Sequence, residues 1–232
     1  MNNLIKQIIE KAKNENRYLL TEIEAKQVFK EAGLQVTDTR LTTNKKDAID
    51  TSMEMGFPVA LKIVSPDIMH KTEAKGVKLN LKTGDEVAKA FDEIMASAEE
   101  KFPNANIHGI SVQRMATPGL EIILGSNVDE QFGSVLMFGL GGIFVEVMKD
   151  VSFGITPITK RDAREMIHNI KGYPLLNGFR GTPRIDVANL ESWLLKLSDF
   201  AQSYPEVKEL DLNPVFAYAQ GAMVVDARII LK

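Results

Sequence analysis

The sequence predicts an α+β protein built from two lobes. Its 232 residues correspond to about 1.5 domains of typical length, which fits one large domain or two closely joined lobes. Hydrophobic residues make up 44% and charged residues 25% of the chain, close to the globular average, so the chain can bury a sizeable core. Strand patterns cluster between helical patterns instead of alternating regularly with them, and this arrangement is typical of α+β lobes.

The charge balance and the absence of cysteine exclude several classes of function. Lys and Arg number 28 and Asp and Glu number 31, which gives a formal net charge of -3. This balance is not typical of a nucleic-acid coat protein or of a polybasic membrane anchor. With no cysteine, the chain has no disulfide, thiolate nucleophile, zinc-thiolate or iron-sulfur site, and it fits a reducing compartment. Carboxylate, amide and histidine side chains remain as possible ligands.

Two helices are expected at the start of the chain. Residues 1–20 mix charged and apolar residues in an amphipathic pattern, which predicts a helix and not a signal peptide. Thr21 followed by Glu24 forms a capping-box pattern and Gly33 is a C-terminal stop signal, so residues 21–33 predict a second helix. Both expectations rest on the spacing of apolar residues in these ranges.

Three strands and two helices are expected between residues 34 and 101. Residues 34–42 alternate weakly as a strand, a helix from about residue 44 ends at Gly56, and residues 58–64 form an apolar run typical of a buried strand. Residues 65–76 are polar and rich in turn formers, which predicts a loop. Alternation over 77–81 predicts a strand, and the strongest helical periodicity in the chain covers 85–101.

After residue 107 the pattern changes to short strands, with a hinge expected near residue 113. The strands are expected over 110–115, 120–125, 134–138 and 144–151. Helices over 160–170 and 187–203 flank a segment rich in Gly and Pro, and two final strands over 208–218 and 222–231 are joined by a tight turn near Gln220-Gly221. The most apolar stretch, 135–145, is too short for a bilayer span. We therefore expect a soluble, cytoplasmic protein.

Lys62 interrupts the apolar strand predicted over 58–64. A buried ammonium is costly unless an anion or a carboxylate meets it, so Lys62 is a candidate phosphate-binding residue. The alternative is a lysine at a strand edge whose ammonium reaches solvent.

Gly139, Gly141 and Gly142 follow an apolar strand and would allow a phosphate to approach the backbone. A plain turn explains them equally well. The chain has no P-loop motif, and Phe144 stands where the dinucleotide-binding fingerprint requires its third glycine.

The last two predicted strands carry a candidate metal site. Asp211 and Asn213 share one strand face, and Asp226 lies on the partner strand. If Ala219 and Gln220 form the turn, Asn213 lies directly opposite Asp226. Carboxylate and amide oxygens suit Mg²⁺, which gains further ligands from water and nucleotide phosphates. The alternative is an ordinary Asn with a surface Asp paired to Arg228, which a register slip of one residue would favour.

His70 lies in the predicted loop, beside Lys71 and between Asp67 and Glu73. A histidine in this setting could act as a general base or as a phosphate acceptor. An ordinary hydrogen-bonding surface residue is the alternative.

Four motifs in order resemble the ATP-grasp fold, and more closely the beta subunit of NDP-forming acyl-CoA synthetases, the ADP-forming acetate-CoA ligases. They lie at 56–71 (GFPVALKIVSPDIMHK), 137–147 (MFGLGGIFVEV), 209–214 (ELDLNP) and 225–228 (VDAR). The resemblance implies an ATP-grasp fold in which two α+β lobes hold the nucleotide between them. It also implies reversible conversion of acyl-CoA, ADP and phosphate into acid, CoA and ATP, through an acyl phosphate and phosphohistidines.

The resemblance implies a role for each matching residue. Lys62 would hold the nucleotide phosphates, the backbone of Gln113, Arg114 and Met115 would meet adenine, and Glu121 would take the ribose hydroxyls. His70 would relay phosphate and Asp211 would orient a phosphohistidine. The remaining assignments are Mg²⁺ ligation by Asn213 and Asp226, and phosphate approach at Gly139, Gly141 and Gly142, with Glu146 nearby in an unspecified role.

The resemblance also implies a partner and a division of the chain. The partner would be an alpha subunit with the CoA-binding domain and the first phosphohistidine, in an α2β2 heterotetramer. Residues 1–20 would form a helix that packs on the second lobe, 21–112 the first lobe and 113–232 the second. The histidine loop departs from the family pattern His-Lys-Ser-Asp-x-Gly-Gly, because Lys75 replaces a glycine.

Two other functions stay open at this point. One is a freestanding ATP-grasp ligase that joins a carboxylate to an amine, and the other is a module that binds ATP and docks a partner without turnover.

Overall fold

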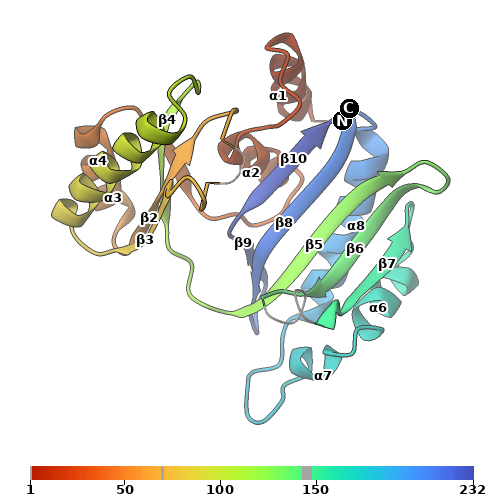
Figure 1. Cartoon of the computed structure of the whole chain (residues 1–232). Helices are drawn as coiled ribbons and strands as arrows, with labels where there is room; N and C mark the ends of the chain where they lie inside the picture. Colours follow the sequence, from red (N-terminus) through yellow and green to blue (C-terminus); the bar gives the residue numbers. More distant parts are fainter. Residues whose placement is uncertain (1, 69–70, 143–147) are drawn as a thin grey trace. The chain divides into compact units, whose positions relative to one another are not determined.

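The computed structural model describes residues 2–68, 71–142 and 148–232 (Figure 1). They form two compact units, which we call the smaller unit (21–23 and 37–117) and the larger unit (the remaining described residues). The predicted lobes began at residues 21 and 113, whereas residues 24–36 belong to the larger unit. The physical reason is that Ala25, Val28 and Phe29 are fully buried in the hydrophobic core of the larger unit.

The smaller unit is a four-stranded antiparallel sheet in the order β1-β4-β2-β3. Helices α3 and α4 pack on one sheet face, where Leu61, Ile63 and Ile110 meet Phe91 and Ile94 of α4 in one core. The bounds of its elements are β1 Thr39–Thr42, α3 Lys45–Met55, β2 Val59–Val64, β3 Val77–Leu81, α4 Gly84–Lys101 and β4 Gly109–Arg114.

The larger unit is a six-stranded antiparallel sheet in the order β10-β8-β5-β6-β7, with β9 paired to β8. Residues of α1, α2, α6 and α8 share one core with the strands, so the helices cover a single face of this sheet. The bounds are α1 Asn3–Asn14, α2 Glu22–Glu31, β5 Leu120–Asp129, β6 Gly133–Leu140, β7 Val151–Ile155, α6 Lys160–His168, α7 Tyr173–Leu176, α8 Val187–Ser203, β8 Val207–Ala217, β9 Ala222–Val224 and β10 Ala227–Leu231.

Three predicted strands differ from the observed ones. The strand expected over 34–42 is limited to β1, Thr39–Thr42. Residues 148–150 are not part of a strand, and 144–147 lie outside the described residues; the strand that pairs with β6 begins at Val151. Asp150 instead buries its carboxylate, which accepts hydrogen bonds from the backbone N–H groups of Lys171 and Gly172, each at 2.7 Å. The predicted last strand is interrupted at Val225 and Asp226. The interruption lies opposite Pro214, which has no backbone N–H to donate.

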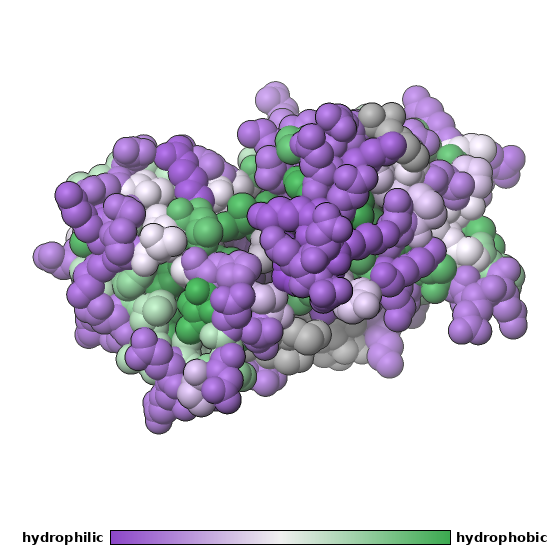
Figure 2. All heavy atoms as spheres, turned by 90° about the horizontal axis from the view of Figure 1, so that it is seen from above, coloured by the Kyte–Doolittle hydropathy of each residue, from purple (hydrophilic) through white to green (hydrophobic). Residues whose placement is uncertain are grey.

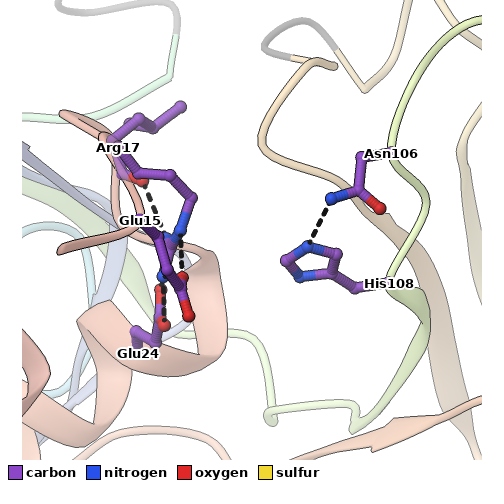
Figure 3. A network of polar contacts seen from close by, with 6 residues as sticks. Glu15, Arg17, Glu24, Asn106 and His108 are labelled. Carbon is purple, nitrogen blue, oxygen red and sulfur yellow. Dashed lines mark hydrogen bonds and ion pairs between the residues drawn. The ribbon is translucent and has the colours of Figure 1, made fainter. Parts of the chain in front are cut away.

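Arg17 holds the connection between α1 and α2 together (Figure 3). Its guanidinium donates to both carboxylate oxygens of Glu24 at 3.0 and 2.8 Å, to Glu15 at 2.8 Å and to the Leu19 carbonyl at 3.2 Å. The two parallel N–H groups of a guanidinium match the two oxygens of a carboxylate, so this pair fixes the orientation of the Glu24 side chain relative to Arg17. The same view shows the amide of Asn106 in contact with the ring of His108 in the smaller unit, at 3.4 Å.

Hydrophilic residues cover most of the face shown in Figure 2, with apolar residues between them. Two apolar side chains of the edge strand β7 are exposed, Phe153 at 63% and Ile155 at 53%. Among the described residues, no helix combines the length and the apolar character needed to cross a bilayer.

Candidate functional site

Lys62 lies in the middle of β2, where all six residues are buried. Val59, Leu61 and Ile63 point into the core with α3 and α4, so Lys62 lies on the opposite face of the sheet. Only 6% of Lys62 is exposed, and the alternative of a lysine that reaches solvent from a strand edge is therefore wrong. The same sheet face carries Ser111, directly opposite Lys62, and the buried Gln113 beside it on β4.

The carboxylate that meets Lys62 comes from Glu22, which the sequence analysis did not identify. The Lys62 Nζ lies 2.7 Å from Glu22 Oε1, and the Lys71 Nζ lies 2.7 Å from Glu22 Oε2. The side chain of Glu22 is 2% exposed. A signal was present, since a buried ammonium requires an acid and Glu22 lies in the first turn of the helix predicted over 21–33. Nothing in the sequence, however, joins positions 40 residues apart.

The loop between β2 and β3 contains His70, which lies outside the described residues. On either side of it the loop is fixed by hydrogen bonds: the Asn106 N–H donates to the Asp67 carboxylate at 2.6 Å, and the Gly76 N–H donates to the Lys71 carbonyl at 2.8 Å. A Cβ added at Gly76 would lie 2.5 Å from the Ile63 side chain, so only glycine fits there.

Lys75 has a φ of 52°, in the left-handed region that favours glycine. The positive φ explains why the family pattern has a glycine at position 75. The lack of space for a Cβ explains the glycine at position 76.

Replacing Lys75 by Gly should stabilise the fold relative to Lys75→Ala by up to about 1 kcal/mol, because Lys and Ala both carry the Cβ that opposes a positive φ. Lys75 is exposed, so the loss of its side chain alone should change little. Chemical denaturation of the three proteins measures the difference. Equal stabilities of the Gly and Ala variants would show that the loop carries no strain at this residue.

The predicted hinge residues lie at the end of β4, with Gln113 and Arg114 inside the strand and Met115 directly after it. Gln113 is buried, the Arg114 N–H donates to the Asp38 carbonyl at 3.2 Å, and the Met115 N–H donates to the Pro58 carbonyl at 3.1 Å. These two N–H groups are therefore engaged within the smaller unit. An adenine bound at this backbone would use its amino group to donate to a carbonyl oxygen.

Glu121, Gly141 and Gly142 lie together in the larger unit. The Gly141 N–H donates to the Glu121 carbonyl at 2.8 Å, and a Cβ added at Gly142 would lie 2.9 Å from a Glu121 carboxylate oxygen. A Cβ added at Gly139 would lie 2.8 Å from the Asp150 carbonyl oxygen. The absence of a side chain at these glycines therefore allows the backbone to lie close to its neighbours. At Gly141 and Gly142 this neighbour is Glu121, the candidate ribose-binding acid. Glu146 lies outside the described residues.

The register predicted for the last hairpin is confirmed. Val215 pairs with Val224 and Leu212 with Ala227, which sets Asn213 opposite Asp226. The Asn213 N–H donates to the Asp226 carbonyl at 3.3 Å. The slipped register that favoured an ordinary Asn and a surface Asp does not occur.

Acidic groups are concentrated around this hairpin. Asp211 lies opposite Arg228, which also pairs with Glu209. Burial raises the pKa of Asp211, Glu209 and Asp226 raise it further by charge repulsion, and Arg228 lowers it. The hairpin thus gathers more negative charge than the single arginine offsets.

Replacing Asp211 by Asn should stabilise the fold at neutral pH. Because the pKa of Asp211 is higher in the folded protein than its ordinary value of 3.8, the wild type loses stability as pH rises from 3.8 through the raised pKa. The variant has no such loss, so its unfolding midpoint should exceed that of the wild type above this window and match it below pH 3.8. Denaturation across pH measures this. A difference that does not change with pH would contradict it.

The donor set at the hairpin fits Mg²⁺. Asn213 on β8 offers an amide oxygen and Asp226, opposite it between β9 and β10, offers a carboxylate oxygen. The acidic surroundings favour a cation. No group of three or more His, Cys, Asp or Glu residues suited to a metal occurs within 2–68, 71–142 and 148–232. Two protein ligands are nevertheless sufficient for Mg²⁺, which completes its shell with water and phosphate oxygens.

Comparisons with known proteins extend over nearly the whole chain. The family model for the ATP-grasp domain matches residues 11–231. The beta subunit of acetate-CoA ligase [ADP-forming] I from Pyrococcus furiosus is 48% identical over 226 residues, which are 97% of each chain.

Two solved structures of the dinucleotide-forming acetyl-coenzyme A synthetase 1 from Ca. Korarchaeum cryptofilum are similar in fold. One, with coenzyme A and Ca-AMPCP, has a TM-score of 0.94 and 46% identity, covering 98% of this chain and 99% of that chain. The other, with coenzyme A and Mg-AMPPCP, has a phosphohistidine segment described as pointing towards the nucleotide binding site; its TM-score is 0.87 at 43% identity, covering 98% and 100% of the two chains. This chain therefore belongs to the ATP-grasp family and, within it, to the beta subunits of ADP-forming acetate-CoA ligases.

Proposed function

We propose that this chain is the nucleotide-binding beta subunit of an ADP-forming acyl-CoA synthetase, which converts acyl-CoA, ADP and phosphate reversibly into acid, CoA and ATP. Its own step is the transfer of a phosphoryl group between a phosphohistidine and ADP. The observation that carries the proposal is the match to a complete beta subunit, because the match covers 97% of both chains and not only a shared nucleotide-binding segment.

The proposal assigns the phosphates to Lys62, whose buried ammonium is suited to an anion. Glu121 takes the ribose hydroxyls, supported by its position against Gly141 and Gly142. The hinge of Gln113, Arg114 and Met115 takes adenine.

The phosphoryl-transfer step uses His70 as the nucleophile. In the direction of ATP consumption, an imidazole nitrogen attacks the γ-phosphorus, an N–P bond forms, the bond to the bridging β-γ oxygen breaks and ADP leaves. Asp211 would orient a phosphohistidine by accepting a hydrogen bond from the ring nitrogen that does not carry the phosphoryl group, which fixes the tautomer of the ring. Mg²⁺ held by Asn213 and Asp226 would supply positive charge to the phosphates. ATP synthesis is the reverse.

The partner in this proposal is an alpha subunit that holds the CoA-binding domain and the first phosphohistidine. A relative named as a beta subunit supports a second kind of chain, and we propose an α2β2 assembly. The relay follows from this division, because the phosphoryl group of an acyl phosphate formed on one subunit must reach ADP on the other.

The test is to incubate the purified chain with Mg²⁺ and ATP labelled in the γ-phosphate, with and without a candidate alpha subunit. The label should be acid-labile and stable in base, as expected of phosphohistidine, and should map to the peptide that contains His70. ATP labelled in the α-phosphate should leave no covalent label. Absence of label in a sample with measured nucleotide binding would overturn the proposal.

A further inference from the structure

Three charged side chains form a buried cluster in the smaller unit, which we call the Glu22 cluster: Glu22, Lys62 and Lys71. Each carboxylate oxygen of Glu22 contacts a different ammonium group at 2.7 Å. The exposed fractions of the side chains are 2% for Glu22, 7% for Lys62 and 22% for Lys71. The cluster joins the first residue of α2, the middle of β2 and the loop after it.

Stability alone does not explain these charges. Taking three ions out of water costs desolvation energy, and apolar residues of similar volume are often as stable as a buried ion pair or better. The neighbours of Lys62 on β2 are all apolar and buried, so a leucine would suit that strand. Ions kept at such a place indicate a function that requires a defined charge.

The geometry of the cluster determines what Glu22 can do. The Glu22 carboxylate contacts both ammonium groups at 2.7 Å, and it therefore holds the ends of Lys62 and Lys71 close to each other. A lysine side chain has four rotatable bonds, and ordering its end loses conformational entropy. Glu22 orders the Lys62 ammonium before a ligand binds. The binding of a phosphate at Lys62 therefore does not include the entropic cost of ordering this side chain.

The geometry points to Glu22 as a positioning residue of the phosphate site. Glu22 orients Lys62 towards the phosphates of the nucleotide, and it sets the position of Lys71, the residue after His70, relative to Lys62. This inference rests on the proposed function, because it requires Lys62 to bind phosphate.

The test measures the affinity of the full chain for Mg-ATP by calorimetry in four proteins: wild type, Glu22→Gln, Lys62→Met and the double variant. Gln keeps the volume of Glu but cannot hold two ammonium groups by charge. Glu22→Gln should weaken Mg-ATP binding about tenfold, and in the Lys62→Met background it should have almost no further effect, since residues that act through one another are not additive.

A matched control is Glu191→Gln. Glu191 is also buried and ion-paired, to Arg164 at 2.9 Å in the larger unit, and its replacement should leave Mg-ATP affinity unchanged. Glu22→Asp, which keeps the charge on a shorter side chain, should recover part of the affinity. If Glu22→Gln does not fold, Lys71→Met removes the other ion pair; it should slow phosphorylation of the chain by Mg-ATP while Mg-ATP affinity stays within about twofold.

The outcomes separate two failures. Unchanged Mg-ATP affinity in Lys62→Met would show that Lys62 does not bind the nucleotide phosphates, and this part of the proposed function would then be wrong. A loss in Lys62→Met together with unchanged affinity in Glu22→Gln would overturn only the positioning role of Glu22. Additive losses in the double variant would also overturn it, because Glu22 would then act independently of Lys62.

Discussion

Replacing His70 by Ala should abolish the synthesis of ATP from acyl-CoA, ADP and phosphate, with a loss of at least about a thousandfold. Removal of a covalent nucleophile eliminates the intermediate and leaves no other acceptor for the phosphoryl group. Binding of Mg-ATP should persist, because the proposed nucleotide contacts come from other residues. The measurement combines the assay of the complete complex with calorimetry on the same protein.

Another histidine of the chain provides a matched control. His168 lies exposed near the end of α6, with its ring 4.2 Å from the ring of Tyr173, and His168→Ala should retain full activity. A comparable loss in both variants would indicate a general effect of histidine removal and not a phosphate relay.

The His70→Ala variant also separates the three functions that the sequence left open. A freestanding ligase that forms an acyl phosphate directly from ATP needs no phosphohistidine, so it would keep its activity in His70→Ala. A module that only binds ATP would show no turnover in either protein and unchanged binding. Loss of turnover together with retained binding is expected only for the relay.

The features of the fold that follow from local spacing were predictable. The helices over 85–101 and 187–203 correspond to α4 and α8, because long apolar periodicities specify both the type and the position of a helix. The register of the last hairpin was also predictable, since the turn at Ala219 and Gln220 determines every pair up to Asn213 and Asp226.

The features that depend on distant partners were not predictable. Apolar residues around 144–151 suggested a strand, yet the position of β7 is determined by its pairing with β6 and by the buried carboxylate of Asp150. The burial of Lys62 was suggested by its strand, whereas its partner Glu22 lies 40 residues away. The division of the chain near residue 24 likewise depends on which core receives Phe29.

The second large effect is expected at the hairpin. Replacing Asp226 by Ala should lower Mg-ATP affinity and phosphoryl transfer about 100-fold, because a carboxylate that binds the metal supplies much of the charge that holds it near the phosphates. Asp226→Asn keeps the volume and an oxygen that can accept the Ala227 N–H, which Asp226 binds at 2.9 Å. This variant should therefore retain the hairpin while it loses the charge.

Titration with Mg²⁺ distinguishes a metal ligand from a structural residue. In Asp226→Asn the Mg²⁺ concentration that gives half-maximal activity should rise, whereas Asp199→Asn, at an exposed position of α8, should leave it unchanged. An unaltered metal dependence in Asp226→Asn would remove the hairpin from the metal site.

The charge of Asp226 can also be read through its neighbour. Asp226 contributes to the raised pKa of Asp211, so the pKa of Asp211 should fall in Asp226→Asn in the absence of metal, and in the wild type it should fall when Mg²⁺ binds, because a cation favours the ionised carboxylate. An NMR titration of the Asp211 carboxylate, with and without Mg²⁺, measures both changes. A fall in the variant without a fall on addition of Mg²⁺ would show that the acidic cluster exists but does not bind the metal, and the metal ligands would then have to lie elsewhere in the chain.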